Sequence, residues 1–199
     1  MKRGSIAIAF LLSISLANFS NACENKVKIE DFIPYLTPEY ISSRVRAVAT
    51  VIDEDYQGNE VTLVCVLKGA IVFTADLMRA LKTPTRLECV QASSYGSSET
   101  AGALTLTGLE KVCLKGKEVM IVDDIYETGN TIEALKQEFL KQQPLSVTSC
   151  VFLLKNVKRK EGRKPDYHAV EIENKWVQGY GLDSEEQHRG LPGVWAKKS

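Results

Sequence analysis

Two adjacent carboxylates, Asp123 and Asp124, stand four residues before a turn of small residues, 128–131 (TGNT). Two carboxylates side by side can accept hydrogen bonds from a vicinal diol, such as that of a ribose. A small-residue turn at the start of a helix directs unpaired backbone N–H groups at an anion, and its two threonine hydroxyls add donors. Alone, the Asp pair is typical of a solvated surface and the turn of a helix cap. Together they predict a site for a phosphorylated sugar.

The elements that must position this segment alternate between strand and helix. Strands, three of them continuous apolar runs, are expected at 61–67 (VTLVCVL), 86–91, 118–123 (EVMIVD) and 147–154 (VTSCVFLL). Helices are expected to open at Thr37 and to span 70–81 and 131–142. This order predicts an α/β fold with a doubly wound, mostly parallel sheet. Ligands bind such sheets beyond the carboxyl ends of the strands, so we expect the site in the loops after Leu67, Val122 and Leu154.

Composition agrees with a single domain that encloses a core. The chain has 199 residues, 44% of them hydrophobic, with 25 basic and 25 acidic side chains. These fractions exclude a disordered chain, a collagen-like chain and a multi-span membrane protein. The zero net charge gives no general attraction to nucleic acid or to an anionic membrane. The five cysteines form no C-x-x-C pair, which argues against a zinc site or a disulfide framework and favours a reducing compartment.

The N-terminus is in conflict with that compartment. Residues 1–22 resemble a secretory signal peptide, with a basic start, an apolar stretch at 6–17 (IAIAFLLSISLA) and small residues at the end. That stretch is too short to cross a membrane as a helix. The alternative is an upstream extension from a misassigned start, with translation beginning near Val27. We therefore divide the chain into an N-terminal extension, 1–26, and a domain, 27–199.

The segment 122–131 (VDDIYETGNT) resembles the motif with which type I phosphoribosyltransferases bind phosphoribosyl pyrophosphate (PRPP). Three further segments match that family in chain order. They are Leu67-Lys68-Gly69, similar to the pyrophosphate loop, Ser94-Tyr95, similar to the mobile lid, and 175–189 (from KWV through GYGLD to Arg189), similar to the small C-terminal hood of the hypoxanthine/guanine branch. The resemblance runs from about Lys28 to Trp195 and implies the type I phosphoribosyltransferase fold.

The resemblance also implies how PRPP is held. Asp123 and Asp124 would hold the ribose hydroxyls. The 5′-phosphate would be cradled by Glu127, Thr128, Gly129, Asn130 and Thr131. Lys68 and Gly69 would present backbone groups to the pyrophosphate, in this family commonly through a cis non-proline peptide. A Mg²⁺ cofactor on the pyrophosphate would be held by Asp183, with Asp123 as a further metal-binding residue.

For the purine, the resemblance implies a second set of residues. Lys155 would donate to the 6-oxo group, Trp176 would stack on the ring, and Val177 and Asp183 would read its edge. The catalytic residues would be Glu127, Lys68 and Arg189. Of these, Arg189 would pair with the leaving group, and Glu127 would take the proton released by the purine. The family usually has Asp at the position of Glu127.

The implied activity is purine salvage: hypoxanthine or guanine and PRPP would give IMP or GMP and pyrophosphate, in the cytoplasm, with a homodimer or homotetramer as the active form. The preference among hypoxanthine, guanine and xanthine stays open. One alternative is a PRPP-sensing regulator that binds nucleic acid on the same fold. Without residues 1–22 the chain has 23 basic and 25 acidic side chains, and 155–164 (KNVKRKEGRK) is its only basic candidate surface. Another alternative, an exported or lipid-anchored binding protein, depends on residues 1–22 alone.

Overall fold

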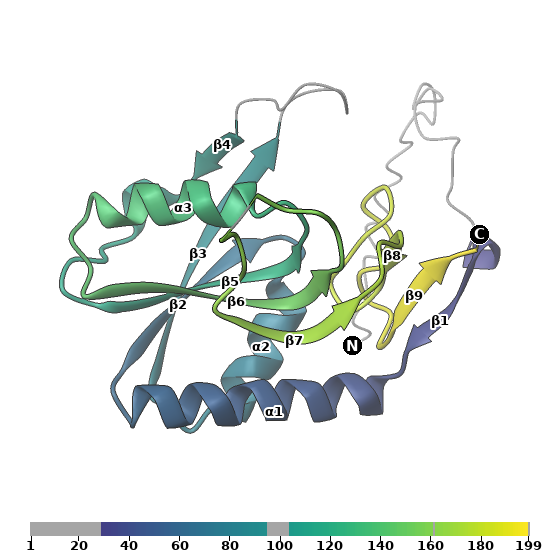
Figure 1. Ribbon diagram of the computed structural model, residues 1–199, viewed down its shortest axis with the longest axis horizontal. Helices are drawn as coiled ribbons and strands as arrows, with labels where there is room; N and C mark the ends of the chain where they lie inside the picture. Colours follow the sequence, from purple (N-terminus) through teal and green to yellow (C-terminus); the bar gives the residue numbers. More distant parts are fainter. Residues whose placement is uncertain (1–28, 95–103, 161, 199) are drawn as a thin grey trace, which may run out of the picture.

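The structure, a computed structural model, describes residues 29–94, 104–160 and 162–198, arranged in two sheets and three helices (Figure 1). The helices are α1 (Pro38–Tyr56), α2 (Ile71–Ala80) and α3 (Asn130–Leu140). The strands are β1 (Phe32–Leu36), β2 (Val61–Leu67), β3 (Thr85–Ser94), β4 (Leu104–Thr107), β5 (Glu118–Tyr126), β6 (Ser146–Lys155), β7 (Tyr167–Ile172), β8 (Val177–Gln178) and β9 (Val194–Lys197). Short 3-10 turns span Ile29–Asp31 and Leu109–Lys111.

The larger sheet has the strand order β4-β3-β2-β5-β6-β7. All its neighbouring strands are parallel except β4, which runs antiparallel to β3 at the edge. Helices α1 and α2 cover one face and α3 covers the other (Figure 1). The predicted doubly wound α/β fold is therefore confirmed. Strands β4 and β7 were not predicted from the sequence.

The sequence signals for the elements act locally as expected. The side chain of Thr37 accepts a hydrogen bond from the backbone N–H of Tyr40 at 3.2 Å, and Pro38 occupies the first helical position of α1. The apolar positions Ile41, Val45 and Ile52 are buried against the sheet. In β2 every residue from Val61 to Val66 is buried, because helices cover both faces of this central strand.

The site lies where the direction of winding reverses. From β2 the chain passes through α2 to β3 on one side, whereas β5 pairs with the other side of β2. Right-handed crossovers in opposite directions place their helices on opposite faces, so the loops after β2 and β5 diverge and leave a crevice. The β2–β5 pairing ends at Cys65 and Val122, while β5 continues beside β6 to Tyr126. Asp123 and Asp124 are thus the first residues of β5 beyond its pairing with β2.

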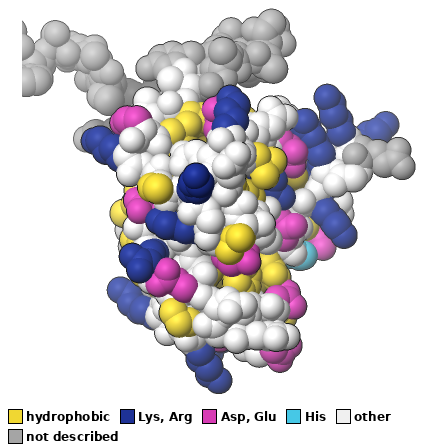
Figure 2. Space-filling model, turned by 90° about the vertical axis from the view of Figure 1, so that its left-hand side faces the viewer, with side chains coloured by type: hydrophobic (Ala, Val, Ile, Leu, Met, Phe, Trp, Pro, Cys, Tyr) yellow, Lys and Arg dark blue, Asp and Glu magenta, His cyan; other side chains and the backbone are white. Residues whose placement is uncertain are grey.

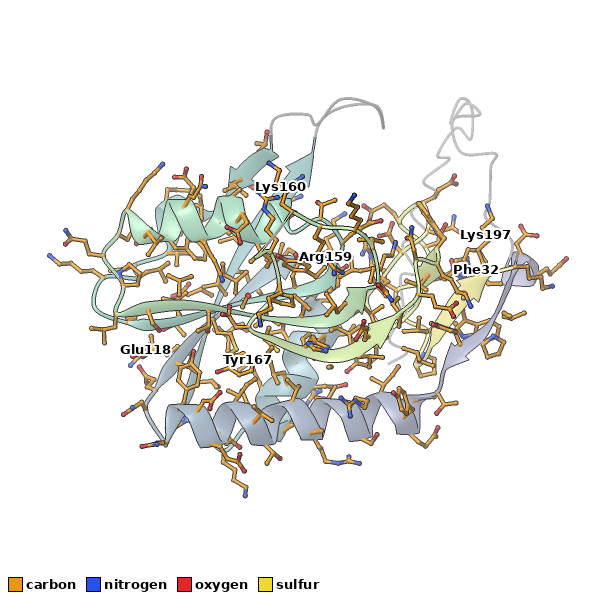
Figure 3. All side chains as sticks on the ribbon, in the orientation of Figure 1. Phe32, Glu118, Arg159, Lys160, Tyr167 and Lys197 are labelled. Atoms are coloured by element: carbon orange, nitrogen blue, oxygen red, sulfur yellow. The ribbon has the colours of Figure 1, made fainter. Side chains whose placement is uncertain are left out.

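The smaller sheet has the order β1-β9-β8 and is antiparallel. We call this sheet, together with the segment 179–193 between β8 and β9, the hood. Strands β8 and β9 form the expected small C-terminal hood, and β1, from the N-terminal part of the domain, adds a third strand to it. Figure 3 shows Phe32 and Lys197, which pair across β1 and β9. Pro34 lies beside a register shift in β1, which fits an edge strand and weakens the strand signal in the sequence.

The hood is packed onto the larger sheet through Tyr180. Its ring centroid lies 4.7 Å from that of Phe152 in β6, and Phe152 in turn packs on Phe73 of α2 at 5.5 Å. The Tyr180 hydroxyl donates to Asp76 of α2 at 2.7 Å. Aromatic packing and a hydrogen bond therefore fix the hood above the carboxyl ends of the strands.

The surface at the opposite end carries no single charge sign. Figure 2 shows this face with Lys and Arg interspersed among Asp and Glu, and with hydrophobic side chains scattered singly. None of the helices in the described part of the chain is long and apolar enough to cross a membrane.

Asp166 anchors the loop between β6 and β7. Its carboxylate accepts hydrogen bonds from the Ser149 backbone N–H at 2.8 Å and the Ser149 hydroxyl at 2.7 Å. It also pairs with Lys136 of α3 at 3.0 Å. Burial alone would raise the pKa of Asp166, but the bonds from Ser149 and Lys136 lower it below its ordinary value. One carboxylate therefore joins the loop to β6 and to α3.

We expect Asp166→Asn to lower the free energy of unfolding at pH 7 by about 1 kcal/mol, since the carboxylate is partly exposed and its interactions are screened. The melting temperature should fall by about 2–4 °C. A lowered pKa stabilises the folded state above the unfolded pKa of about 3.9, and that contribution is lost as the pH falls through the folded value. Urea unfolding of both proteins should therefore show the difference narrowing from pH 6 toward pH 3. A constant difference would assign the effect to packing and not to the charge.

Candidate active site

Two adjoining cavities open at the switch point between β2 and β5. One, of about 260 Å³, is lined by Val66, Leu67, Lys68, Gly69, Ala92, Asp123, Asp124, Ile125, Thr131, Asp183 and Arg189. The other, of about 200 Å³, is lined by Asp123 and by residues 125–132. Asp123, Ile125 and Thr131 line both. The predicted loops after β2 and within 122–131 are thus brought together, and the hood adds Asp183 and Arg189.

The Asp pair lies at the junction of the two cavities. Only 7% of Asp123 is exposed, and its Oδ1 accepts a hydrogen bond from the Asp124 backbone N–H at 2.9 Å. Burial and the neighbouring Asp124 carboxylate raise the pKa of Asp123 well above its ordinary value, and burial raises the pKa of Asp124 as well. A ligand that brings hydroxyl donors or a cation would offset the free-energy cost of burying these two carboxylates.

Gly69 makes the position of Asp124 possible. A Cβ at residue 69 would lie 1.7 Å from Asp124 Oδ2, so any side chain there would displace the carboxylate. The hood approaches the same loop: a Cβ at Gly181 would lie 2.2 Å from the Gly69 carbonyl oxygen. Gly181 also has φ of +99°, a conformation that favours glycine. The peptide bond Leu67–Lys68 is cis, as the resemblance implies.

The small-residue turn forms the start of α3. Gly129, with φ of +80°, is the N-cap and provides no side-chain cap for the helix. The first amides of a helix have no partner inside it, and its N-terminus carries a partial positive charge. Thr128 and Asn130 are exposed, and Thr131 is half-buried. This segment, 127–131, which we call the phosphate loop, can therefore receive an anion.

Two cations meet at the opposite end of the site. Lys68 Nζ lies 3.0 Å from Glu186 Oε2, and Arg189 Nη2 lies 3.1 Å from the same oxygen. Arg189 Nη2 also lies 2.9 Å from Asp183 Oδ1, and its Nη1 donates to the Gly181 carbonyl at 2.9 Å. The carboxylates of Glu186 and Asp183 therefore balance two cations that an anionic ligand could also bind.

Lys155 and Glu127 form a donor–acceptor pair. Lys155 ends β6 and is largely buried, and its Nζ lies 3.6 Å from Glu127 Oε1. Glu127 directly follows β5, the strand beside β6, which explains how residues 28 positions apart become neighbours. An ammonium beside a carboxylate can bind a ligand edge that presents an acceptor next to an N–H.

The remaining predicted residues are less closely grouped. Trp176, which is 60% exposed, lines a cavity of about 600 Å³ together with Asp183, and Val177 is buried in β8. That cavity does not include Lys155 or Glu127, and among the described residues that line it Asp183 alone also lines the cleft. Ser94 ends β3, and the structure describes its backbone alone. Tyr95 lies outside the described residues.

The sequence analysis missed two groups of residues. Glu186, which holds Lys68 and Arg189, lies in a polar hood loop without a recognisable motif. Arg159 and Arg163 lie in the basic segment 155–164, which charge alone indicated only as a candidate surface for nucleic acid. Both instead donate hydrogen bonds to the phosphate loop. No pattern in a single sequence distinguishes these arginines from the lysines around them.

The carboxylates of the cleft fit a magnesium ion. In the part of the chain that the structure describes, no three metal-ligating side chains converge on one point. However, the raised pKa of Asp123 marks an uncompensated buried carboxylate, and Asp183 lines the same cavity. Mg²⁺ prefers such oxygen donors and is usually bound by one or two carboxylates together with substrate phosphates.

Comparisons with known proteins agree with this geometry. A family model described as the phosphoribosyl transferase domain matches residues 37–185. The hypoxanthine-guanine phosphoribosyltransferase of Aquifex aeolicus is 37% identical over 162 residues, which cover 80% of this chain and 91% of that protein.

Solved structures extend the likeness to three dimensions. A hypoxanthine-guanine phosphoribosyltransferase from Bacillus anthracis matches with a TM-score of 0.78 and 33% identity, covering 84% of this chain and 98% of that one. The hypoxanthine phosphoribosyltransferase of Trypanosoma cruzi in complex with the product IMP matches with a TM-score of 0.76 and 34% identity, covering 83% and 93%. The chain therefore belongs to the phosphoribosyltransferase family, among its hypoxanthine-guanine members.

Proposed function

We propose that the protein transfers the phosphoribosyl group of PRPP to a 6-oxopurine, hypoxanthine or guanine, in purine salvage. The observation that carries this proposal is the cleft itself, in which an anion-receiving helix start and a pair of cations lie at opposite ends of a buried carboxylate pair. PRPP has the matching order of groups: a 5′-phosphate, a ribose diol and a pyrophosphate.

The binding roles follow from that order. The phosphate loop holds the 5′-phosphate through its amides and the hydroxyls of Thr128 and Thr131. Asp123 and Asp124 accept hydrogen bonds from the ribose hydroxyls. The backbone of Lys68 and Gly69 contacts the pyrophosphate. The side chains of Lys68 and Arg189 leave Glu186 and bind the oxygens of the pyrophosphate instead.

Lys155 and Glu127 select the base. In a 6-oxopurine the 6-oxygen, an acceptor, is adjacent to N7, which carries or receives a proton. Lys155 donates to the oxygen while Glu127 faces N7, and their 3.6 Å separation supports simultaneous contact with both atoms. Adenine presents an amino donor at position 6, which the Lys155 ammonium repels. Trp176 stacks on the purine ring, and Val177 and Asp183 contact the remaining edge of the base.

In the reaction, N9 of the purine attacks C1 of the ribose as the bond to pyrophosphate breaks, which inverts that carbon. Glu127 takes the proton that leaves the base. Lys68 and Arg189 stabilise the charge that grows on pyrophosphate. Asp183 and Asp123 would hold Mg²⁺, which would supply additional positive charge to the leaving group. The lid at Ser94 and Tyr95 would exclude water.

We propose further that 27–199 is the catalytic domain, active in the cytoplasm as a homodimer or homotetramer, with 1–26 a dispensable extension. The relatives are transferases, and two arginines of the basic segment face the phosphate loop. Neither observation supports the nucleic-acid-binding regulator.

The first test is a Mg²⁺-dependent transfer assay with PRPP on the full chain and on residues 27–199. Hypoxanthine and guanine should be converted to nucleotides, and adenine should not. The turnover of xanthine, which differs from them at C2, will show which groups the site accepts at that position. Equal turnover by the two chains would support the dispensable extension. Binding of PRPP without turnover of any base would overturn the proposed function.

Replacement of the base isolates the proton transfer. Glu127→Gln keeps the side-chain length but cannot accept the proton, so kcat should fall by roughly 10²–10⁴-fold while KM for PRPP changes little. Glu127→Asp, which restores the residue usual in the family, is the control and should retain turnover. If the Gln variant turns over near the normal rate, Glu127 is not the base.

The Asp pair should cost stability in the ligand-free protein. Asp123→Asn keeps the acceptor for the Asp124 N–H and removes a buried charge, so the melting temperature at pH 8 should rise by about 2–4 °C, equivalent to about 1 kcal/mol.

The pH dependence of this gain has a defined sign. Because the folded pKa of Asp123 is raised, its cost is absent below the unfolded pKa of about 3.9 and complete above the folded value. The gain should therefore vanish toward pH 4. PRPP binding should be lost in the same variant. A lower melting temperature at pH 8 would contradict the proposed cost.

A further inference from the structure

The loop that follows β6 places two arginines against the phosphate loop. Arg159 Nε donates to the Glu127 carbonyl at 2.8 Å, across 32 positions of sequence. Arg163 Nη1 donates to Asn130 Oδ1 at 2.7 Å and lies 3.5 Å from the Thr128 carbonyl oxygen. Figure 3 shows Arg159 and Lys160 on this loop, on the side of the sheet that α3 covers. The two ends of the phosphate loop are thus each held by one guanidinium.

Arg159 is fixed by more than one contact. Its guanidinium lies over the ring of Tyr126, 5.6 Å from the centroid. Its Nη2 is inaccessible to solvent and has no hydrogen-bond partner among the described residues. A buried donor on a charged group without an acceptor is costly, and the contacts with Glu127 and Tyr126 hold the guanidinium in place despite that cost.

The carbonyl contacts determine where the amides of the phosphate loop point. In a trans peptide the C=O and the next residue's N–H point in opposite directions. Binding of the Glu127 carbonyl to Arg159 therefore directs the Thr128 N–H away from Arg159. The position of Arg163 beside the Thr128 carbonyl acts in the same way on the Gly129 N–H. Thr128 and Gly129 line the cavity at the start of α3.

The charges around the pair favour an anion. Lys158 and Lys164 lie on the same loop. The acidic side chains described in the phosphate loop, the first turn of α3 and the β6–β7 loop are Glu127, Glu133 and Asp166. Of these, Glu127 is paired with Lys155 and Asp166 with Lys136.

We infer that Arg159 and Arg163 are positioning residues for the phosphate loop and set the affinity of the site for a ribose 5′-phosphate group. This inference rests on the proposed function, because it assigns the 5′-phosphate of PRPP and of the nucleotide product to that loop. The basic segment is then part of the substrate site and not a surface for nucleic acid.

The test separates the two anionic ends of the site. The full chain and its Arg159→Met, Arg163→Met and Arg159→Lys variants are titrated calorimetrically with IMP, which carries only the 5′-phosphate, and with magnesium pyrophosphate, which carries only the leaving group. Lys160→Met is the matched control, because it removes one positive charge from the same loop, and the exposed Lys160 side chain has no hydrogen bond or ion pair with a described residue.

Each Met variant should weaken IMP binding by about 10-fold or more and leave pyrophosphate binding within about 2-fold, as expected for loss of a charged hydrogen bond. In the transfer assay, KM for PRPP should rise while kcat changes little. Arg159→Lys should be intermediate, since it retains the charge without the planar fork. Lys160→Met should bind both ligands as the unaltered protein does.

Unchanged IMP affinity in the Arg159→Met and Arg163→Met variants would overturn the inference, as would an equal loss for Lys160→Met. A parallel loss of IMP and pyrophosphate binding would indicate general damage to the fold and also contradict it. If the unaltered protein binds IMP but transfers nothing from PRPP, the proposed function fails while the titrations still decide the role of the arginines.

Discussion

The structure depends on the burial of two carboxylates at the point where β2 and β5 separate. Asp123 and Asp124 lose hydration there, and neither is neutralised by a side chain of the larger sheet. The rest of the site is arranged around this uncompensated charge. Gly69 yields space to Asp124, α3 presents its positive end on one side, and Lys68 and Arg189 stand on the other. A substrate with a diol between two anions satisfies all three regions at once.

Charges are also balanced where the hood meets the loop after β2. Lys68 and Arg189 share one oxygen of Glu186, so each cation has a carboxylate partner. These contacts are exposed and therefore weak, which allows an incoming anion to replace them. At the opposite end, the guanidinium groups of Arg159 and Arg163 hold carbonyl oxygens and leave the amides of the phosphate loop available.

Most of the larger sheet and the central part of the site could be predicted from the sequence because the signals are local. The apolar run of β2, the cap at Thr37 and the segment 122–131 each lie within a few neighbouring residues. Strands β1, β4, β7, β8 and β9 could not be predicted, since their pairing partners are distant or their length is short. The contacts of Arg159 and Glu186 could not be predicted for the same reason. Arg159 contacts Glu127 across 32 positions of sequence, and Glu186 contacts Lys68 across 118.

The order of strands in the hood has a consequence for synthesis of the protein. Strand β9 lies between β1 and β8, although it is the last of the described elements in chain order, and the Lys198 N–H donates to the Asp31 carbonyl at 2.8 Å. All strands of the larger sheet and the phosphate loop precede β9 in the chain, so the ribosome makes them first. The hood acquires its middle strand only after every other described element has been synthesised. A stop codon shortly before Val194 would therefore leave the larger sheet complete and the hood without its middle strand.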